Sequence, residues 1–269
     1  CFTMSYKYKS NLRHLFSSYS YNDIVRIHRV YCKSVSGPNE KFQIDESQSQ
    51  HLIKALRLKE GVLVEVFDGS GKFASCKILK ILKKFIEVER IEELKHQTPN
   101  ERLLVTIIPV IKKNNFNFMI QKLAEIGTNK FIIYKPDLID QSVAKKDITK
   151  IVNKSNEILI NVCKQCGNNF IPSILKSDSL EEAINMVKDT TEIYSFDTEA
   201  SEYFNQNELG KDSSITTITG PESGFSEKEL GIINMHDVKE RYLGQNILRA
   251  ETAAIYVSSL IKNHFGKIS

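Results

Sequence analysis

The sequence contains no tryptophan, few prolines and glycines, and no long run of apolar residues. No hydrophobic stretch approaches the ~20 residues that a membrane-spanning helix needs, so a membrane protein is not expected. The five cysteines are odd in number and irregularly spaced, which is untypical of a secreted disulfide framework. The chain is therefore expected in a reducing compartment, and the cytoplasm is the favoured one.

Two familiar chemical motifs are incomplete or missing. Cys163 and Cys166 form a single C-x-x-C pair, with no second ligand pair of similar spacing and no His-x-x-x-His. No metal is therefore expected, and structural or RNA-facing cysteines are favoured over zinc or redox chemistry. No G-x-G-x-x-G occurs either, which disfavours a Rossmann-type nucleotide site.

The composition is otherwise that of an ordinary globular protein. The 269 residues are 41% hydrophobic and 26% charged, enough for one or two domains with a real core. A net charge of +4, from 37 basic and 33 acidic residues, is compatible with RNA binding but is shared by many enzymes. Composition alone leaves the function open.

Residues 1–24 are basic and serine-rich, with no acid before Asp23. This composition fits a transit peptide, but we favour an over-extended start, because patterned sequence begins near Val25. The segment is expected to be disordered or wrongly assigned.

Residues 25–93 have the pattern of a small, mainly β domain. A short helix is predicted over Glu46 to Leu56 and a strand over Val62 to Phe67. The turn Asp68 to Gly71 then leads into strands over Phe73 to Ile81 and Phe85 to Ile91. The basic residues of this region are Lys59, Lys72, Lys77, Lys80, Lys83, Lys84 and Arg90.

Residues 94–102 are polar and predict a linker, and strand and helix patterns alternate over residues 103–269. Strands are predicted over Leu103 to Val110, Lys130 to Tyr134, Glu192 to Phe196 and Ser214 to Thr219. Helices are predicted over Asn117 to Ile126, Asp147 to Cys166, Leu180 to Val187 and Ala250 to Asn263. Such alternation indicates an α/β domain with a mostly parallel sheet and helices on both faces.

Two turns rich in small residues suggest a ligand pocket in this second domain. Gly220 to Gly224 follows a predicted strand, and Leu243 to Arg249 precedes the last predicted helix. Loops at the carboxyl ends of parallel strands bind ligands in open α/β sheets, and glycine lets the backbone approach closely. We therefore expect both turns to line one pocket.

Six segments, in order over residues 25 to 264, resemble the signatures of the RsmE-type ribosomal RNA methyltransferases of the SPOUT class. They are Arg26 to Tyr31, His51 to Arg57, Phe67 to Gly71, Met119 to Gly127, Cys163 to Pro172, and GPESGFSEKE with LGQNILRAETA within Ile218 to Ala254. The resemblance implies S-adenosylmethionine-dependent methylation of N3 of a uridine in 16S ribosomal RNA, acting on that RNA or on the small ribosomal subunit.

The resemblance also implies an architecture. It predicts a PUA-like RNA-binding β domain over residues 25–93 and a SPOUT α/β-knot (trefoil) domain over residues 103–269. Enzymes of this class are commonly homodimers, because a partner subunit completes the pocket, so a homodimer is expected.

By position, the donor is expected in a cleft made by the loops after Phe196, Thr219 and Tyr242. The expected cofactor-binding residues are Asp197, Gly220, Pro221, Glu222, Gly224, Leu243, Gly244, Ile247 and Leu248. Backbone amide groups in these loops would hold the two ends of S-adenosylmethionine.

Methyl transfer to uracil N3 requires loss of the N3 proton, which leaves negative charge on the ring oxygens. Arg249, with its permanent charge, is the candidate to stabilise that charge, although a salt bridge would also explain it. Glu222 is a further candidate for orienting the base or accepting the proton, although a charge at a helix N-terminus would also explain it. Glu251 is another catalytic candidate, which capping of the last helix explains almost as well.

The resemblance implies RNA contacts at Arg26, Arg29, Arg57, Lys122 and Gln165, although a residue of this kind, taken singly, is more often just a surface group. Two positions depart from the family pattern. Ser223 stands where glycine is usual, which matters if that position needs a positive φ. Gln141 stands where an arginine is expected, which puts one RNA contact in doubt.

Three other functions stay open at this point. A SPOUT ribose 2′-O-methyltransferase would share the knot, but the PUA-like region and the ILRAET segment argue against it. A non-catalytic RNA-binding or assembly protein would not need the two pocket turns. A small-molecule site on an ordinary α/β sheet would leave the basic β domain unexplained.

Overall fold

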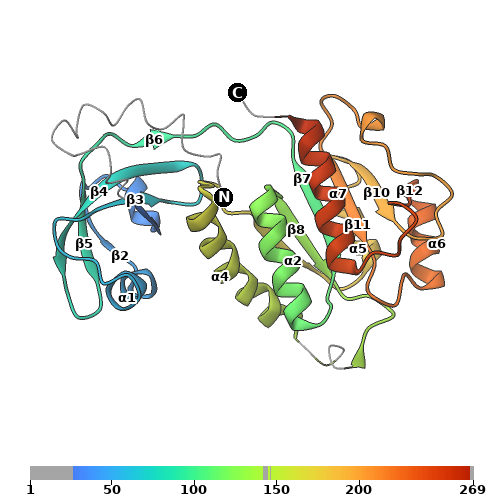
Figure 1. Cartoon of the computed structure of the whole chain (residues 1–269), viewed down its shortest axis with the longest axis horizontal. Helices are drawn as coiled ribbons and strands as arrows, with labels where there is room; N and C mark the ends of the chain where they lie inside the picture. The colour runs from blue at the N-terminus through green and yellow to red at the C-terminus, as the bar shows by residue number, and fades with distance from the viewer. Residues whose placement is uncertain (1–26, 142–144, 146, 267–269) are drawn as a thin grey trace.

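The computed structural model describes residues 27–141, 145 and 147–266 and folds them into two lobes, each built on its own sheet (Figure 1). The expected extension, residues 1–24, lies outside the described residues. The first sheet has six strands in the order β1-β3-β4-β5-β2, with β6 paired to β4. The second also has six, in the order β12-β10-β11-β7-β8-β9.

The first lobe is mainly antiparallel. Its elements are β1 (His28–Tyr31), a 3₁₀ turn (Lys33–Ser36), β2 (Lys41–Ile44), α1 (Glu46–Lys54), β3 (Leu63–Phe67), β4 (Lys72–Ile81), β5 (Ile86–Arg90) and β6 (Lys95–His96). β1 pairs with β3 in parallel, and the other pairs are antiparallel. Alternate residues of the strands form one buried core, including Val64, Val66, Ile86 and Val88. β6 lies inside the predicted linker: Lys95 and His96 pair with the start of β4, so this part of the linker belongs to the first sheet.

Every strand of the second sheet runs parallel to its neighbours. The strands are β7 (Leu104–Pro109), β8 (Lys130–Tyr134), β9 (Ser173–Ser177), β10 (Glu192–Phe196), β11 (Ile215–Thr219) and β12 (Lys239–Arg241). All five residues of β11 are buried, as expected for a central strand covered on both faces. The predicted mostly parallel α/β sheet is confirmed.

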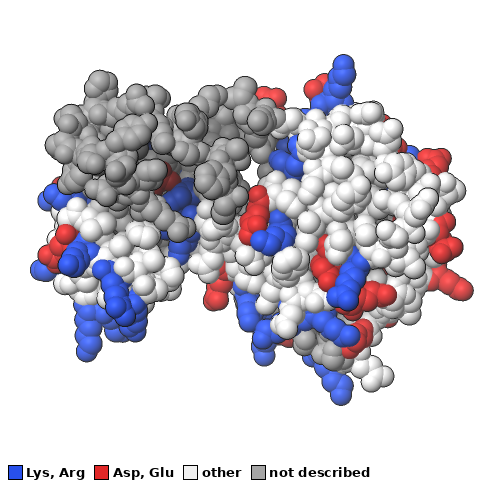
Figure 2. Space-filling view, viewed as in Figure 1, with Lys and Arg blue, Asp and Glu red and all other residues white. Residues whose placement is uncertain are grey.

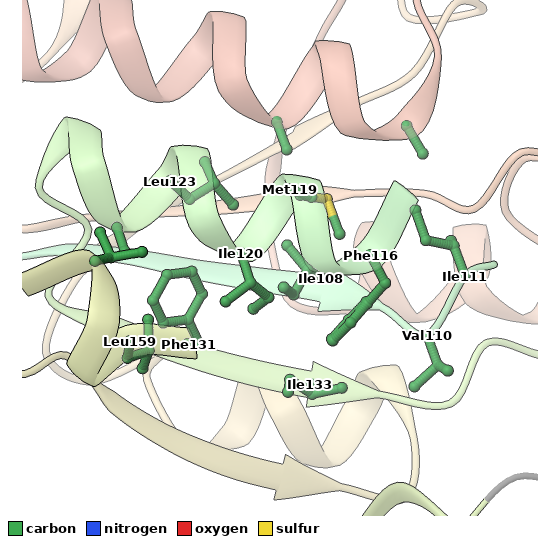
Figure 3. Packing of buried hydrophobic residues seen from close by; sticks show 14 of the residues in the cluster. Ile108, Val110, Ile111, Phe116, Met119, Ile120, Leu123, Phe131, Ile133 and Leu159 are labelled. Carbon is green, nitrogen blue, oxygen red and sulfur yellow. The ribbon is translucent and has the colours of Figure 1, made fainter. Parts of the chain in front are cut away.

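The helices cover both faces of this sheet. They are α2 (Lys113–Ile126), α4 (Ile148–Cys166), α5 (Leu180–Asn185), α6 (Glu227–Met235) and α7 (Ala250–Phe265), with a 3₁₀ turn at Gln206–Glu208. One buried cluster joins α2, α4 and α7 to the sheet, and another joins α5 and α6 to its other face. Figure 3 shows Phe116, Met119, Ile120 and Leu123 of α2 pointing into the first cluster.

Local sequence fixes the helix ends. The Asp147 side chain accepts from the backbone N–H of Thr149, and Ser226 forms a reciprocal capping box with Glu229. Gly127 ends α2 at φ 103°, a conformation that glycine adopts without strain. These caps fix where α4 and α6 begin and where α2 ends, and therefore where the neighbouring loops start or stop.

The carboxyl end of α4 joins the two lobes. Arg29 of β1 donates from Nε to Glu65 Oε1 at 2.6 Å and from Nη1 to the Cys163 carbonyl at 2.6 Å, and a further N–H reaches Asn169 Oδ1. Its guanidinium also lies 4.6 Å from the centre of the Phe67 ring. We call this set the junction; it holds α4 against the first sheet.

Backbone bonds complete the junction. The Gly71 N–H donates to the Asn169 carbonyl at 3.1 Å, and the Ile171 N–H donates to the Gly69 carbonyl at 2.9 Å. The segment after α4 therefore pairs with the turn between β3 and β4. This turn belongs to the buried contact between the lobes.

Gly71→Ala is expected to lower the free energy of unfolding by about 2 kcal/mol more than Gly61→Ala. Both glycines have positive φ, 100° and 86°, so both replacements strain the backbone. Only at Gly71 would the new methyl group also meet a ring, 2.4 Å from Phe170 Cζ, whereas Gly61 faces open space. Urea unfolding of the two variants measures the difference, and equal losses would show that the Phe170 contact relaxes freely.

Candidate functional site

Three loops at the carboxyl edge of the second sheet enclose a cavity of about 300 Å³. They follow β10, β11 and β12, which are neighbours in the order β12-β10-β11. Because these strands are parallel, their ends meet at one edge, and the predicted loops come together there. We call this space the loop cavity. It is lined by Phe196 to Thr198, Thr219 to Glu222, Gly224, Phe225, Tyr242 to Gly244, Asn246 to Ala250 and Ala253.

The wall of the loop cavity contains every residue predicted to hold the donor. These are Asp197, Gly220, Pro221, Glu222, Gly224, Leu243, Gly244, Ile247 and Leu248. The lining mixes apolar side chains with backbone and a few charged groups, which is usual for cofactor pockets of this size.

Two observations fit a nucleoside-bearing cofactor in this space. Thr219 Oγ1 is buried at the cavity wall and has no hydrogen-bond partner among the described residues, so it can bond a ligand. Gly224 and Gly244 have φ of 77° and 143°, with open space where a side chain would begin. No side chain therefore keeps a ligand away from the backbone at Gly224 and Gly244, although the Gly224 N–H itself donates to the Pro221 carbonyl at 3.0 Å.

The predicted catalytic residues divide between the cavity and the core. Arg249 is exposed, precedes α7 and lines the cavity, and its side chain makes no helix-capping bond. Glu222 lines the same cavity and accepts from Asn115 Nδ2 at 3.2 Å. Glu251, by contrast, is 8% exposed and is not part of the wall. The structure therefore places Arg249 and Glu222 on one cavity wall and Glu251 outside it, and the catalytic roles of all three stay predictions.

Comparison with known protein families identifies the family of this chain. Residues 98–262, more than half of the chain, match the model of the RNA methyltransferase domain, and residues 44–89 match the RNA methyltransferase PUA domain. The chain belongs to this RNA methyltransferase family. A PUA-like lobe and a SPOUT-type α/β lobe, both predicted above, are thereby confirmed.

Known relatives extend over nearly the whole chain. The ribosomal RNA small subunit methyltransferase E of Buchnera aphidicola is 30% identical over 91% of this chain and 99% of its own length. The Bacillus subtilis protein of the same name is 26% identical over 82% of this chain and 89% of its own. The crystal structure of the Neisseria gonorrhoeae protein of that name, bound to S-adenosylmethionine, is 21% identical. It has a TM-score of 0.77 and covers 88% of this chain and 98% of its own.

Hydrogen bonds tie the β11 loop of this RNA methyltransferase to the loop after β8. Ser223 Oγ donates to the Leu138 carbonyl at 2.7 Å, and Ser226 Oγ donates to Asp137 Oδ2 at 2.9 Å. Among the described residues, only Arg57 and Asp237 have positive φ without being glycine, so Ser223 needs no glycine-like conformation. The loop therefore accommodates this departure from the family pattern, and its hydroxyl gains a partner.

Ser223→Ala is expected to weaken S-adenosylmethionine binding about threefold to tenfold, because losing one hydrogen bond of about 1 kcal/mol leaves the β11 loop less ordered. Titration calorimetry measures the dissociation constant. Ser259→Ala is the matched control, because its Oγ also donates to a carbonyl, that of Ile255, on α7 outside the cavity. Equal donor affinity in both variants would contradict a role for the bond.

The predicted RNA contacts are scattered. Arg26 lies outside the described residues, and Arg29 is committed to the junction, with 12% of its side chain exposed. Lys122 pairs with Glu125 at 2.8 Å. Arg57 and Gln165 are exposed, as is Gln141, which stands where the family has arginine. The junction role of Arg29 could not be read from the sequence, since Glu65, Cys163 and Asn169 lie 36, 134 and 140 positions away.

Of the four cysteines in the described residues, Cys32, Cys76 and Cys163 are buried and Cys166 is partly buried. Cys163 is buried in the junction and donates from Sγ to the Phe170 carbonyl at 3.6 Å. Burial raises the pKa of its thiol to about 12, so it is no nucleophile at neutral pH. In the described ranges, no group of three metal-ligating side chains occurs, and no helix is long and apolar enough to span a bilayer.

Proposed function

We propose that this chain transfers the methyl group of S-adenosylmethionine to N3 of a uridine in 16S ribosomal RNA. The observation that carries the proposal is the loop cavity, whose wall joins the donor-type loops to Arg249. The Buchnera and Bacillus relatives, named as small-subunit ribosomal RNA methyltransferases, support the RNA. The Neisseria structure, solved with S-adenosylmethionine, supports the donor.

The two lobes would have different roles in the reaction. Residues 25–93 would bind RNA as a PUA-like domain, residues 94–102 would link, and residues 103–269 would carry the chemistry. Two separate sheets and two family models, at residues 44–89 and 98–262, support this division.

The chain's own residues hold and orient the reactants. S-adenosylmethionine supplies an electrophilic methyl group on a sulfonium sulfur. Backbone of the β11 loop and of Leu243 to Leu248 would bind the two ends of the donor, with Thr219 Oγ1 as one further partner. Orientation of this kind can contribute several kcal/mol to a methyl transfer, about 7–11 in favourable cases.

Arg249 and Glu222 act on the base. As the N3 proton leaves, negative charge spreads onto the uracil oxygens, and the Arg249 guanidinium stabilises it from the cavity wall. Glu222, held by Asn115, would orient the base or accept the proton. The N3–methyl bond forms as the sulfur–methyl bond breaks, and the proton leaves to Glu222 or to water.

The protein would act as a homodimer in the cytoplasm. Ile247 on the cavity wall is 85% exposed, Phe118 on α2 is 49% exposed and Tyr256 on α7 is 40% exposed. Apolar side chains this exposed, one of them on the cavity wall, favour a covering surface, and a second subunit would supply it. The irregular, unpaired cysteines fit the reducing cytoplasm.

The test uses small-subunit particles and their RNA from a host that lacks the modification. Incubation with the protein and labelled S-adenosylmethionine, followed by digestion to nucleosides and mass spectrometry, is expected to give labelled 3-methyluridine. Label in a ribose-methylated nucleoside would overturn the base chemistry. No transfer and no donor binding by calorimetry would leave an RNA-binding protein.

A further inference from the structure

A half-buried lysine at the groove between the lobes has no acidic partner. Lys164, near the end of α4, donates from Nζ to Gln48 Oε1 of α1 at 2.9 Å and to Asn161 Oδ1 at 3.4 Å. Both acceptors are neutral amides, and no carboxylate in the described part of the chain lies within ion-pairing distance. The ammonium charge is therefore held in position between the lobes without being neutralised.

Two histidines from the first lobe lie beside this lysine. His51 follows Gln48 by three residues on α1 and so lies on the same side of that helix. His28 of β1 and Lys164 of α4 both act electrostatically on His51, which puts the three groups in one region. β1, α1 and α4 thus each bring one basic residue to this region. We call His28, His51 and Lys164 the groove cluster.

The electrostatics of the groove cluster favour an anion. Burial, Lys164 and His28 together lower the pKa of His51, and burial lowers the pKa of Lys164. The charged groups acting on His51, from α4 and β1, are both basic. Like charges brought together out of water are unfavourable, and a bound anion would relieve their repulsion.

The surroundings of the groove suit a polyanion. Figure 2 shows lysine and arginine side chains on both lobes, mainly along the lower edge of each, with acidic side chains among them. A single free phosphate would meet only the cluster, whereas an RNA strand could also follow the basic surfaces on either side.

We propose that the groove cluster binds a backbone phosphate of the RNA substrate. Lys164 Nζ and protonated His51 would donate to the phosphate oxygens, and the Gln48 side chain would keep the lysine extended into the groove. The proposal rests on the proposed function, since it takes RNA as the substrate. It adds a contact that spans both lobes, so that the strand is fixed relative to the loop cavity as well as to the β-rich lobe.

Affinity for RNA tests the site. Fluorescence anisotropy with a short fluorescein-labelled single-stranded RNA compares the full-length chain with Lys164→Gln, which keeps an amide donor toward Gln48. The variant is expected to bind about fivefold to tenfold more weakly at low salt, with a salt slope shallower by about 1. Lys154→Gln removes an exposed lysine elsewhere on α4 and is expected to keep the dissociation constant within about twofold.

The pH dependence tests the histidine. A bound phosphate favours protonated His51, and the pKa of the free His51 is lowered, so the wild-type affinity is expected to keep rising as the pH falls below the ordinary histidine pKa of about 6.5. His51→Gln should flatten much of this rise while leaving donor affinity unchanged. Since His51 is exposed, this variant carries the test even if Lys164→Gln folds poorly.

The outcomes separate the groove site from the activity. In methylation assays, the variants should raise the KM for RNA and leave kcat at saturating RNA unchanged. Wild-type affinity and salt slope in both variants, with normal methyl transfer, would overturn the phosphate site and leave the proposed function intact. RNA binding that depends on Lys164, with no methyl transfer by the wild type, would support the site and overturn the proposed function.

Discussion

Arg249→Ala is expected to slow formation of 3-methyluridine by about 10²–10³-fold while changing the donor dissociation constant by less than about threefold. Arg249 lines the loop cavity without capping α7, so its guanidinium is free to face the substrate. The charge it stabilises develops only as the N3 proton leaves. Its removal should therefore lower kcat more than it weakens binding, which single-turnover kinetics and calorimetry measure separately.

Two further variants make this result specific. Arg249→Lys keeps a positive charge but loses the planar fork, so an intermediate rate is expected. Lys113→Ala removes an exposed cation on α2 outside the cavity and should leave kcat unchanged. A wild-type kcat in Arg249→Ala would show that another group stabilises the charge on the uracil ring.

Arg29→Met is expected to lower the free energy of unfolding by about 3 kcal/mol. The replacement leaves Glu65 without its partner and Asn169 Oδ1 without the Arg29 donor, and it leaves the Cys163 carbonyl with its helix-end bond from the Gly167 N–H. The methionine stem can still pack on Phe67, so the loss reports mainly on the polar contacts. Urea unfolding measures it, and small-angle scattering should show the lobes moving apart.

The same replacement at Arg57 is the control. Arg57 lies on the same lobe but is exposed, and Arg57→Met should change the free energy of unfolding by less than about 0.5 kcal/mol. Arg57 has a positive φ, but arginine and methionine are both non-glycine residues, so the replacement does not change the backbone strain at this position. Similar losses in the two variants would show that Arg29 stabilises the junction no more than a surface arginine does.

The loop cavity could be predicted from the sequence because its determinants are local. Small residues directly after a buried strand, as at Gly220 after β11, indicate a ligand loop wherever strands run parallel. Alternation of strand and helix patterns then predicts that the strands are parallel. The order of the strands in the sheet is harder to predict from the sequence. For their loops to meet, however, β10, β11 and β12 only need to end at the same edge of the sheet.

Long-range and orientational features could not be predicted in this way. Arg29 and Asn169 are 140 positions apart in the sequence, and the sequence around either residue does not predict the contact. Glu251 shows the second limit. Arg249 precedes α7 in extended backbone and lines the cavity, whereas Glu251, two residues later in the first turn of the helix, is 8% exposed and lies outside the cavity wall. The CxxC pattern was likewise ambiguous until its burial was known.

The sheet order has a consequence for how the chain is made. The first lobe is one continuous segment, residues 28–96, that leaves the ribosome early. The central strand β11 must instead insert beside β7, made over 100 residues before it, and the loop cavity closes only once Arg249 has emerged. Pairing over such separations is slow, so donor binding is expected to be the last property a nascent chain acquires. A prematurely terminated chain would carry the basic lobe without the chemistry, and it would compete for RNA that it cannot modify.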